Sequence, residues 1–396
     1  MREWLPEKYA NADLSVSIKR AEMFVLRAPC ETPVRTSFGT MFDRPAVFVR
    51  LESSDGAVGL GEVWSNFPSC GAEHRGKLLE TAIFPALMER EYSDPAACFE
   101  KLTERFERLA IQTGEFGPIA QCIAGIDGAL WDLVAKRADA PLYHFLGGTS
   151  AVIGTYASGI NPTGTLETVA RCRAQGYNAF KLKIGFGDDI DLKNLRGIAD
   201  GLLDGEQMMT DANQGWSVEK TFNMLPKLAE FPLKWLEEPI LATSACSDWQ
   251  ELANISSIPL AAGENIMGFA DFDAAMSMGA LGVIQPDLCK WGGISGTYPV
   301  AKNILETGHR YCPHFLGGGI GLAASAHLLA AVGGGGLLEI DSNANPLRED
   351  LFTPDMNAGK IDIGQDAGLG MSSKHFEEFI AAQNTSTLTA RIELTK

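Results

Sequence analysis

Short apolar segments alternate with helical stretches through the second half of the chain. From residue 150, apolar runs long enough for one strand recur at regular intervals. We expect strands near 153–158, 179–184, 207–211, 234–238, 259–263, 282–286, 310–313 and 336–340. Eight strands separated by helical segments over about 200 residues predict a parallel (β/α) barrel.

The first half has a different pattern. Residues 18–63 are predicted to be β structure, with a hairpin that turns at Asp55-Gly56, and residues 72–138 carry three helical patterns. After residue 355 the pattern loosens, although SSKHFEEFIAAQ predicts one more helix. We therefore expect three parts: an α+β domain, a barrel domain and a C-terminal segment that returns to the first domain, covering residues 1–148, 149–354 and 355–396.

Composition narrows the class of protein. Apolar residues make up 45% of the 396 positions, which is typical of a globular protein, and the formal charge is −17. That charge argues against binding to nucleic acid or to an anionic membrane, and it means that an anionic substrate needs a local positive site. Eight cysteines without a C-x-x-C pair predict reduced, mostly buried thiols in a cytoplasmic protein.

No stretch of the sequence suggests targeting to a membrane. The N-terminal MREWLPEKYANADL lacks the apolar core of a signal peptide. The weakly polar stretch from Phe315 to Leu338 contains His327, serines and many glycines, so it is too interrupted for a membrane span. A glycine-rich loop leading into a buried helix fits that stretch better.

The strand AFKLKIG carries two lysines among apolar residues. Side chains alternate along a strand, so Lys181 and Lys183 point to the same face. A solvent-facing edge strand would explain an isolated pair. In a barrel, however, these ammonium groups face a cavity, where each cation is expected to lower the pKa of the other. A lysine that is neutral part of the time can abstract a proton.

Charged residues stand at the ends of seven successive predicted strands. The separations from one residue to the next are 28, 26, 27, 23, 27 and 25, about one βα unit each time. Active sites of such barrels lie at the carboxyl ends of the strands. The residues in this register are Lys183, Asp211, Glu237, Glu264, Asp287, His314 and Glu339.

Three adjacent strands end in carboxylates. Asp211, Glu237 and Glu264 offer hard oxygen ligands without a cysteine or histidine, a set that suits Mg²⁺. Taken singly, each carboxylate would more often form a salt bridge or cap a strand end. Glu237 and Glu238 are adjacent and must diverge, so we assign Glu237 as the ligand and Glu238 to a supporting position.

The next two strands end in an aspartate and a histidine. A carboxylate bonded to one imidazole nitrogen fixes the tautomer and makes the other nitrogen a better base. A single histidine at a strand end is more often structural. With Asp287 one βα unit upstream, His314 is better explained as an acid/base group.

The chain resembles the enolase superfamily, specifically its mandelate racemase subgroup. The resemblance rests on KLK, TDAN, WLEEP, GEN, QPD, CPH and LEID in this order and spacing, and it covers nearly the whole chain. It implies a modified TIM barrel of the (β/α)7β type under an α+β capping domain built from the N-terminal region and the C-terminal tail. The overall class is then α/β and α+β.

The resemblance also implies a role for each residue. Asp211, Glu237 and Glu264 would bind one Mg²⁺ per active site, and Lys183 would be one base. His314, supported by Asp287, would be the second acid/base group. Lys181 would neutralise the substrate carboxylate, Glu339 would hydrogen-bond the substrate or the enediolate, and Asn213 would line the pocket.

Several reactions are compatible with this set of residues. The shared step removes the proton α to a carboxylate to give a stabilised enediolate. We favour loss of a β-hydroxyl from an acid sugar to give a 2-keto-3-deoxy acid. Racemisation or epimerisation, other lyase or cycloisomerase chemistry, and a barrel that only binds an acid ligand are the alternatives.

Substrate choice and assembly are less constrained by the sequence. The loops 34–44 and 62–68 are expected over the barrel mouth, where Arg35, Arg44 and Trp64 could contact substrate or serve the structure alone. We expect a small-molecule carboxylate as the substrate. Relatives of this kind commonly form dimers or octamers, so we expect a homo-oligomer.

Overall fold

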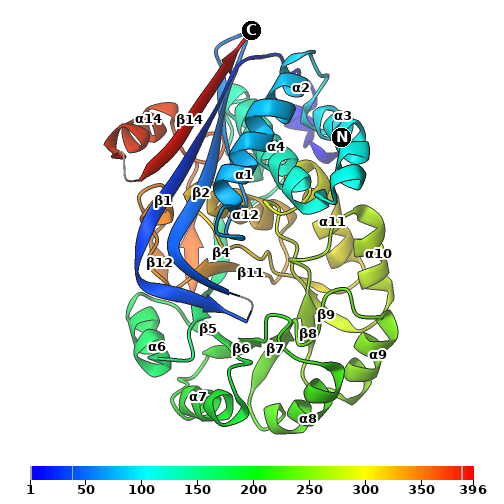
Figure 1. The fold of residues 1–396 in the computed structure, drawn as a ribbon, viewed down its shortest axis with the longest axis vertical. Coiled ribbons are helices and arrows are strands. Elements are labelled where there is room, and N and C mark those ends of the chain that lie inside the picture. The colour runs from blue at the N-terminus through cyan, green and yellow to red at the C-terminus, as the bar shows by residue number, and fades with distance from the viewer. Residues whose placement is uncertain (1, 38, 385–386) are drawn as a thin grey trace.

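The computed structural model describes residues 2–37, 39–384 and 387–396, and it has two layers of different architecture. An antiparallel sheet with the order β14-β1-β2-β3 lies against helices at one end of the molecule, and a barrel fills the other end (Figure 1). The strands of the sheet are β1 (Ile18–Thr36), β2 (Gly39–Ser53), β3 (Val58–Val63) and β14 (Leu388–Thr395).

The sheet contains two hairpins, one of which turns at the predicted position. Residues 54–57 connect β2 to β3, which confirms the hairpin predicted at Asp55-Gly56. The β1–β2 hairpin is longer than predicted, because its pairing continues to Thr36↔Gly39. The described residues between 34 and 44, predicted as a loop, therefore form the end of a hairpin that extends toward the barrel (Figure 1).

Three helical segments follow the β2–β3 hairpin, as predicted. The first is α1 (Gly71–Leu78), which continues through a π-helical turn (Leu79–Ile83) into α2 (Phe84–Met88). The other two are α3 (Pro95–Thr113) and α4 (Phe116–Arg137), and the short α5 (Leu142–Phe145) follows. Of these helices, α1, α2 and α4 pack on the sheet, while α3 packs on α4. Two 3₁₀ turns, Arg2–Trp4 and Glu7–Tyr9, precede β1.

Eight parallel strands form the barrel at the positions that the sequence predicts. β4 to β10 pair in chain order, and β11 pairs with β4. The strands are β4 (Val152–Ile160), β5 (Ala179–Lys183), β6 (Gln207–Asp211), β7 (Leu233–Glu237), β8 (Leu260–Ala262), β9 (Leu281–Ile284), β10 (Arg310–Tyr311) and β11 (Leu337–Asp341).

One helix follows each of the first seven barrel strands. They are α6 (Thr165–Ala174), α7 (Asp188–Asp200), α8 (Val218–Leu228), α9 (Cys246–Ile255), α10 (Phe269–Ser277), α11 (Gly293–Glu306) and α12 (Gly319–Val332). β11 leads instead to the four-residue α13 (Pro346–Glu349). This arrangement is the predicted (β/α)7β barrel under an α+β capping domain.

The C-terminal segment contacts both layers. The hairpin β12 (Met356–Asn357) and β13 (Lys360–Asp362) pairs with β4 of the barrel. The predicted helix is α14 (Ser373–Ala382), and β14 then pairs antiparallel with β1. β14, in which partly buried apolar residues alternate with exposed polar ones, was not predicted from the sequence.

A small apolar layer closes the barrel interior beneath the carboxyl ends of the strands. One residue from each strand β4 to β9, together with Cys312 just after β10, forms a cluster separate from the main core. Because this apolar layer fills the barrel interior, the polar side chains gather at the carboxyl ends of the strands. The members are Tyr156, Ala179, Met209, Trp235, Ala261, Val283 and Cys312.

Two further expectations concern the whole chain. All eight cysteines are free thiols and five of them are buried, as predicted. Within residues 2–37, 39–384 and 387–396, no helix combines the length and the apolar character that crossing a membrane requires.

Candidate active site

Two lysines from the barrel interior form one wall of the site. β5 lies between β4 and β6, and Lys181 and Lys183 are only 1% and 9% exposed, which excludes a solvent-facing edge strand. Lys181 Nζ lies 2.7 Å from Glu237 Oε1 and 2.8 Å from Glu339 Oε1, and it sits over the ring of Tyr156. Lys183 Nζ lies 3.2 Å from Asp211 Oδ2.

The expected lowering of the lysine pKa is wrong for this arrangement. Burial and the neighbouring Lys181 both lower the pKa of Lys183, but Asp211 and more distant carboxylates outweigh them, so the net shift is upward. Burial likewise opposes the charge of Lys181, whose pKa is nevertheless raised because Glu237 and Glu339 lie in contact with it. The carboxylates paired with the two lysines thus outweigh the effect of the neighbouring cation.

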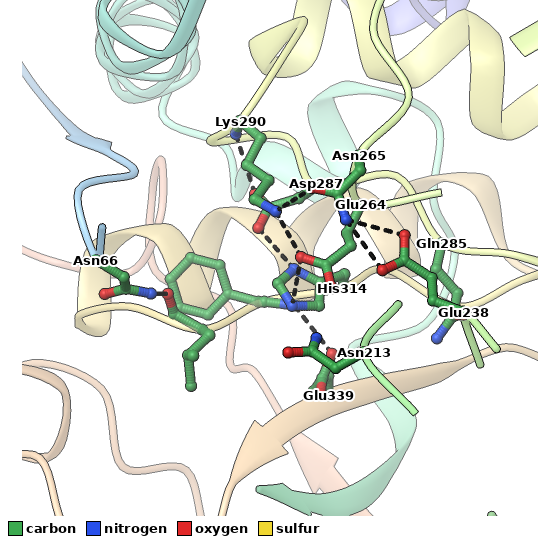
Figure 2. A network of polar contacts seen from close by, with 12 residues as sticks. Asn66, Asn213, Glu238, Glu264, Asn265, Gln285, Asp287, Lys290, His314 and Glu339 are labelled. Atoms are coloured by element: carbon green, nitrogen blue, oxygen red, sulfur yellow. Dashed lines mark hydrogen bonds and ion pairs between the residues drawn. The ribbon is translucent and has the colours of Figure 1, made fainter. Parts of the chain in front are cut away.

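The predicted aspartate–histidine dyad is assembled opposite Glu264 (Figure 2). His314 Nδ1 lies 2.8 Å from Asp287 Oδ2, and His314 Nε2 lies 3.3 Å from Glu264 Oε2. Burial would lower the pKa of His314, but Glu264, Glu339 and Asp287 raise it to about 9. The imidazole is therefore a cation at neutral pH, with one nitrogen fixed by Asp287 and the other facing the carboxylates.

Both glutamates at the end of β7, Glu237 and Glu238, are buried, but they have different partners. Glu237 accepts hydrogen bonds from Lys181 and from the side chains of Trp235 and Gln285. Glu238 accepts two hydrogen bonds from the Asn265 amide, at 2.9 and 3.0 Å. Adjacent side chains diverge here as the sequence argument expected, helped by a positive φ of 37° at Glu238.

A third lysine in the site was missed by sequence reasoning. Lys290 Nζ lies 2.5 Å from Glu264 Oε2 and 3.0 Å from Asn265 Oδ1 (Figure 2). Its side chain is 11% exposed and lies over the indole ring of Trp64, 4.8 Å from the ring centre. Lys290 comes three residues after Asp287 in QPDLCK, so an inspection of the residues just beyond each strand end could have found it.

The site carries more acidic than basic groups. Its cations are three lysines and His314, and its six buried carboxylates are Asp211, Glu237, Glu238, Glu264, Asp287 and Glu339. Burial and the nearby Glu264 raise the pKa of Glu238 well above its usual range, a sign of like charges crowded together. Six carboxylates with hard oxygen donors, beside only four basic groups, fit a divalent cation such as Mg²⁺.

The three predicted ligands are turned toward lysines in this structure. Asp211 faces Lys183, Glu237 faces Lys181 and Glu264 faces Lys290. As a result, within the described part of the chain no three Asp, Glu, His or Cys side chains converge closely enough to ligate one ion. The structure therefore brings the three carboxylates to one end of the barrel without arranging them around a common point.

Asn213 and Trp64, the other predicted pocket residues, both border the site. The backbone N–H of Asn213 donates to Asp211 Oδ1 at 2.7 Å. The side-chain oxygen of Asn213 is buried without a hydrogen-bond partner among the described residues. The backbone carbonyl of Asn213 accepts a hydrogen bond from Ser37 at the end of the β1–β2 hairpin. The Trp64 indole contacts Lys290, which places it beside the carboxylate cluster.

The two arginines suggested by the sequence have different outcomes. The side chain of Arg35 lies outside the described part of the structure. Arg44 was expected in an exposed loop, and that expectation is wrong because Arg44 is 1% exposed. It pairs with Asp341 of β11 at 2.6 Å and so joins the hairpin to the barrel, in a structural role.

A cavity of about 730 Å³ lies between helices of the capping domain and of the barrel domain, and it reaches Asn265 next to Glu264. It is lined by residues of α3, α4, α9 and α10, including Phe106, Ile119 and Trp249. The predicted catalytic and metal-binding residues do not line it. The chemistry therefore belongs to the strand ends inside the barrel and not to this cavity.

Two family models match this chain. The model described as mandelate racemase / muconate lactonizing enzyme, N-terminal domain, matches residues 20–147, and the model described as enolase C-terminal domain-like matches residues 165–376. The chain belongs to the mandelate racemase/muconate lactonizing enzyme family of the enolase superfamily. This result confirms the resemblance inferred from the sequence.

Solved structures of the family have the same fold as this chain. A mandelate racemase/muconate lactonizing enzyme from Bordetella bronchiseptica RB50 is 49% identical, with a TM-score of 0.88 and coverage of 93% of this chain and 100% of that chain. L-talarate/galactarate dehydratase from Salmonella typhimurium LT2, liganded with Mg and L-lyxarohydroxamate, is 25% identical, with a TM-score of 0.80 and coverage of 97% and 95%.

The curated relatives catalyse different reactions. The 3,6-anhydro-alpha-L-galactonate cycloisomerase of Streptomyces coelicolor is 31% identical over 303 residues, which are 74% of this chain and 82% of that protein. Other relatives include an arabinonate dehydratase and an N-succinyl-L-Arg/Lys racemase. Membership of the family therefore leaves the reaction of this enzyme to be argued from its own site.

Proposed function

We propose that this enzyme removes the proton α to the carboxylate of an acid sugar and then eliminates water to give a 2-keto-3-deoxy acid. The observation that carries the proposal is the pair of different acid/base groups at one carboxylate cluster. Lys183 is a buried lysine on a strand, and His314 is an imidazole fixed by Asp287. Elimination needs such a pair, because one group must accept a proton and the other must donate one.

Lys183 is the base in this proposal. In the unliganded arrangement the ammonium is stabilised by Asp211, and burial and Lys181 oppose its charge. When Asp211 turns away to another partner, the strongest influence that favours the ammonium is lost, and burial and Lys181 shift the balance toward the neutral amine. The neutral amine takes the α-proton, and the electrons of the broken C–H bond form the enediolate.

His314 is the acid. Its pKa of about 9 keeps the imidazole protonated at neutral pH, and Asp287 orients the ring. Collapse of the enediolate breaks the bond between the β-carbon and its hydroxyl, and His314 protonates the departing oxygen to release water. The enol that remains tautomerises to the 2-keto acid.

The remaining residues of the site bind and stabilise charge. Lys181 neutralises the substrate carboxylate, and Glu339 hydrogen-bonds the substrate or the enediolate. Asp211, Glu237 and Glu264 would hold one Mg²⁺, as their oxygen donors and the excess of carboxylates over basic groups suggest. When bound, the ion would stabilise the negative charge that develops on the carboxylate oxygens.

The test is a panel of acid sugars incubated with the enzyme and Mg²⁺ in D₂O. We expect a 2-keto acid from at least one of them. Deuterium exchange with inverted configuration and no keto acid would replace the dehydratase by a racemase or epimerase, and release or closure of a ring without loss of water would indicate a cycloisomerase. Binding without any exchange would indicate a barrel that only binds its ligand.

We also propose that the protein is a closed homo-oligomer, a dimer or an octamer, as is usual for soluble assemblies. Light scattering at micromolar concentration tests this expectation. A monomeric mass would contradict it.

A further inference from the structure

The loop that carries His314 contacts the capping domain directly. His314 lies three residues beyond β10, and the chain then runs through Leu316 and Gly318 into α12. The side chain of Asn66, from the capping domain, donates to the Leu316 carbonyl at 2.6 Å (Figure 2). The loop that carries His314 is thus hydrogen-bonded to the capping domain, whereas Asp287 belongs to the barrel domain.

Glu62 makes the second contact between the capping domain and this loop. It lies in β3, is 5% exposed, and accepts hydrogen bonds from the Gly318 N–H at 2.5 Å and the Gly321 N–H at 2.8 Å. Those amides belong to the first turn of α12, whose N–H groups have no partner inside the helix. Burial raises the pKa of Glu62 to about 7, although both N–H groups favour its charged form.

The contact leaves the loop little freedom to move. A side chain at Gly318 would place its Cβ 2.8 Å from the Phe48 ring and 3.0 Å from Glu62 Oε1, so only glycine lets the loop approach the capping sheet this closely. The loop is also bonded from the barrel, because the Phe315 N–H donates to Glu339 Oε2. The position of His314 therefore depends on contacts from both domains.

We infer that Glu62 is a positioning residue for His314: it fixes the His314 loop and the start of α12 against the capping domain, and so serves the proton donation assigned to His314. The inference rests on the proposed function for the step it affects. Glu62 precedes Trp64 and Asn66 on the same segment, so the segment that borders the substrate site also sets the position of the acid. Lys183 has no such dependence, because it belongs to a strand of the barrel itself.

A structural role alone would predict a different result. Asp132 serves as the control, because it is also a buried carboxylate of the capping domain that accepts two backbone hydrogen bonds, from Leu60 and Leu369, in addition to its ion pair with Lys136. It contacts neither α12 nor the His314 loop in the described hydrogen bonds. Loss of either carboxylate should destabilise the fold, whereas only loss of Glu62 should act on His314.

The experiment compares Glu62→Gln, Asn66→Ala and Asp132→Asn in the full-length enzyme with Mg²⁺ in D₂O. Glutamine keeps the shape of Glu62 but offers one acceptor oxygen for two N–H groups. We expect Glu62→Gln to slow formation of the 2-keto acid by about 10–100-fold, the loss expected when a catalytic group is displaced by about 1 Å. Its α-deuterium exchange and KM should stay close to wild type. Asn66→Ala should change the ratio of elimination to exchange in the same direction, and Asp132→Asn should leave that ratio unchanged.

A second readout does not depend on the reaction. The ring ¹⁵N chemical shifts of His314, assigned with a His314→Asn variant, should move in Glu62→Gln and stay unchanged in Asp132→Asn. Equal loss of exchange and elimination in Glu62→Gln, with unchanged ring shifts, would overturn the inference. Moved ring shifts in an enzyme whose wild type forms no keto acid would leave the positioning role standing and reject the proposed dehydration instead.

Discussion

The two sides of the active site are built in different ways. Lys181 and Lys183 lie within a barrel strand, between the ladders that β5 makes with β4 and β6. Asp287 and His314 lie three residues beyond β9 and β10, on loops. The lysine side is therefore fixed by the barrel sheet, whereas the dyad depends on what packs against its loops.

The capping domain bonds to the dyad side through buried carboxylates at two helix starts. Glu62 accepts from the first turn of α12, and Asp127 of α4 accepts from the Ile294 and Ser295 N–H groups at the start of α11. These are the helices that follow the two dyad strands. The base thus lies on a rigid barrel strand, and the acid lies on a loop that the capping domain holds. In such an arrangement the barrel alone positions the group for proton abstraction, whereas the capping domain also affects the group for loss of water.

The largest expected effect comes from removing either proton-transfer group. Lys183→Met or His314→Asn should reduce turnover by roughly 10²–10⁴-fold, the usual contribution of a general acid or base. Steady-state assays on the true substrate measure the loss. Circular dichroism should show an intact fold in both variants, and full activity in Lys183→Met would contradict the mechanism.

The next effect concerns the metal. Mutation of a residue that hydrogen-bonds to a metal ligand typically lowers metal affinity by roughly 10–100-fold. Removal of the direct ligand Asp211 should therefore lower the affinity at least as much. Titration calorimetry with Mg²⁺ on Asp211→Asn measures this loss, and Glu339→Gln, a buried carboxylate outside the ligand set, should lose less affinity. EDTA treatment should abolish activity and Mg²⁺ should restore it. An enzyme that stays fully active after chelation would show that the ligand assignment is wrong.

A smaller change should follow from weakening the dyad. The pKa of His314 is raised to about 9, so its acidic form is present below that pH and is lost as the pH rises through it. Asp287 is one of the carboxylates that raise this pKa. In Asp287→Asn the alkaline decline of kcat should therefore begin at lower pH than in wild type. A decline that stays in place would separate the alkaline limb from His314.

The smallest effect is expected at the cap residue that covers Lys290. Trp64 lies over the ammonium group at 4.8 Å, a cation–π contact worth about 0.5–1 kcal/mol at a partly exposed site. Trp64→Leu should therefore change KM by about two- to fivefold with little change in kcat. A large loss of kcat would instead place Trp64 in the chemistry.

Most of the fold was predictable because the barrel repeats its pattern. An apolar strand followed by a charged residue recurs once per βα unit, which located all eight strands and brought Asp287 to His314 and Lys183 to Asp211. The resemblance to the family then supplied the (β/α)7β form. The boundaries after residues 148 and 354 stay a prediction.

The rest depends on contacts between residues distant in sequence. The pairing of Lys181 with Glu237 and Glu339, which reverses the expected pKa shift, joins three strands. The apolar/polar alternation of LTARIELT is typical of a strand and was missed, but its pairing with β1 at the other end of the chain could not be seen from the sequence. Arg44 looks like a loop residue until its partner Asp341, almost 300 residues later, is known.

The measurement that tests the account most directly is α-deuterium exchange by His314→Asn in D₂O with Mg²⁺ and the true substrate, beside Lys183→Met. If Lys183 removes the α-proton and His314 expels the hydroxyl, His314→Asn should exchange the α-hydrogen and form no keto acid, while Lys183→Met should do neither. Exchange retained in Lys183→Met and lost in His314→Asn would contradict the account and reverse the two roles.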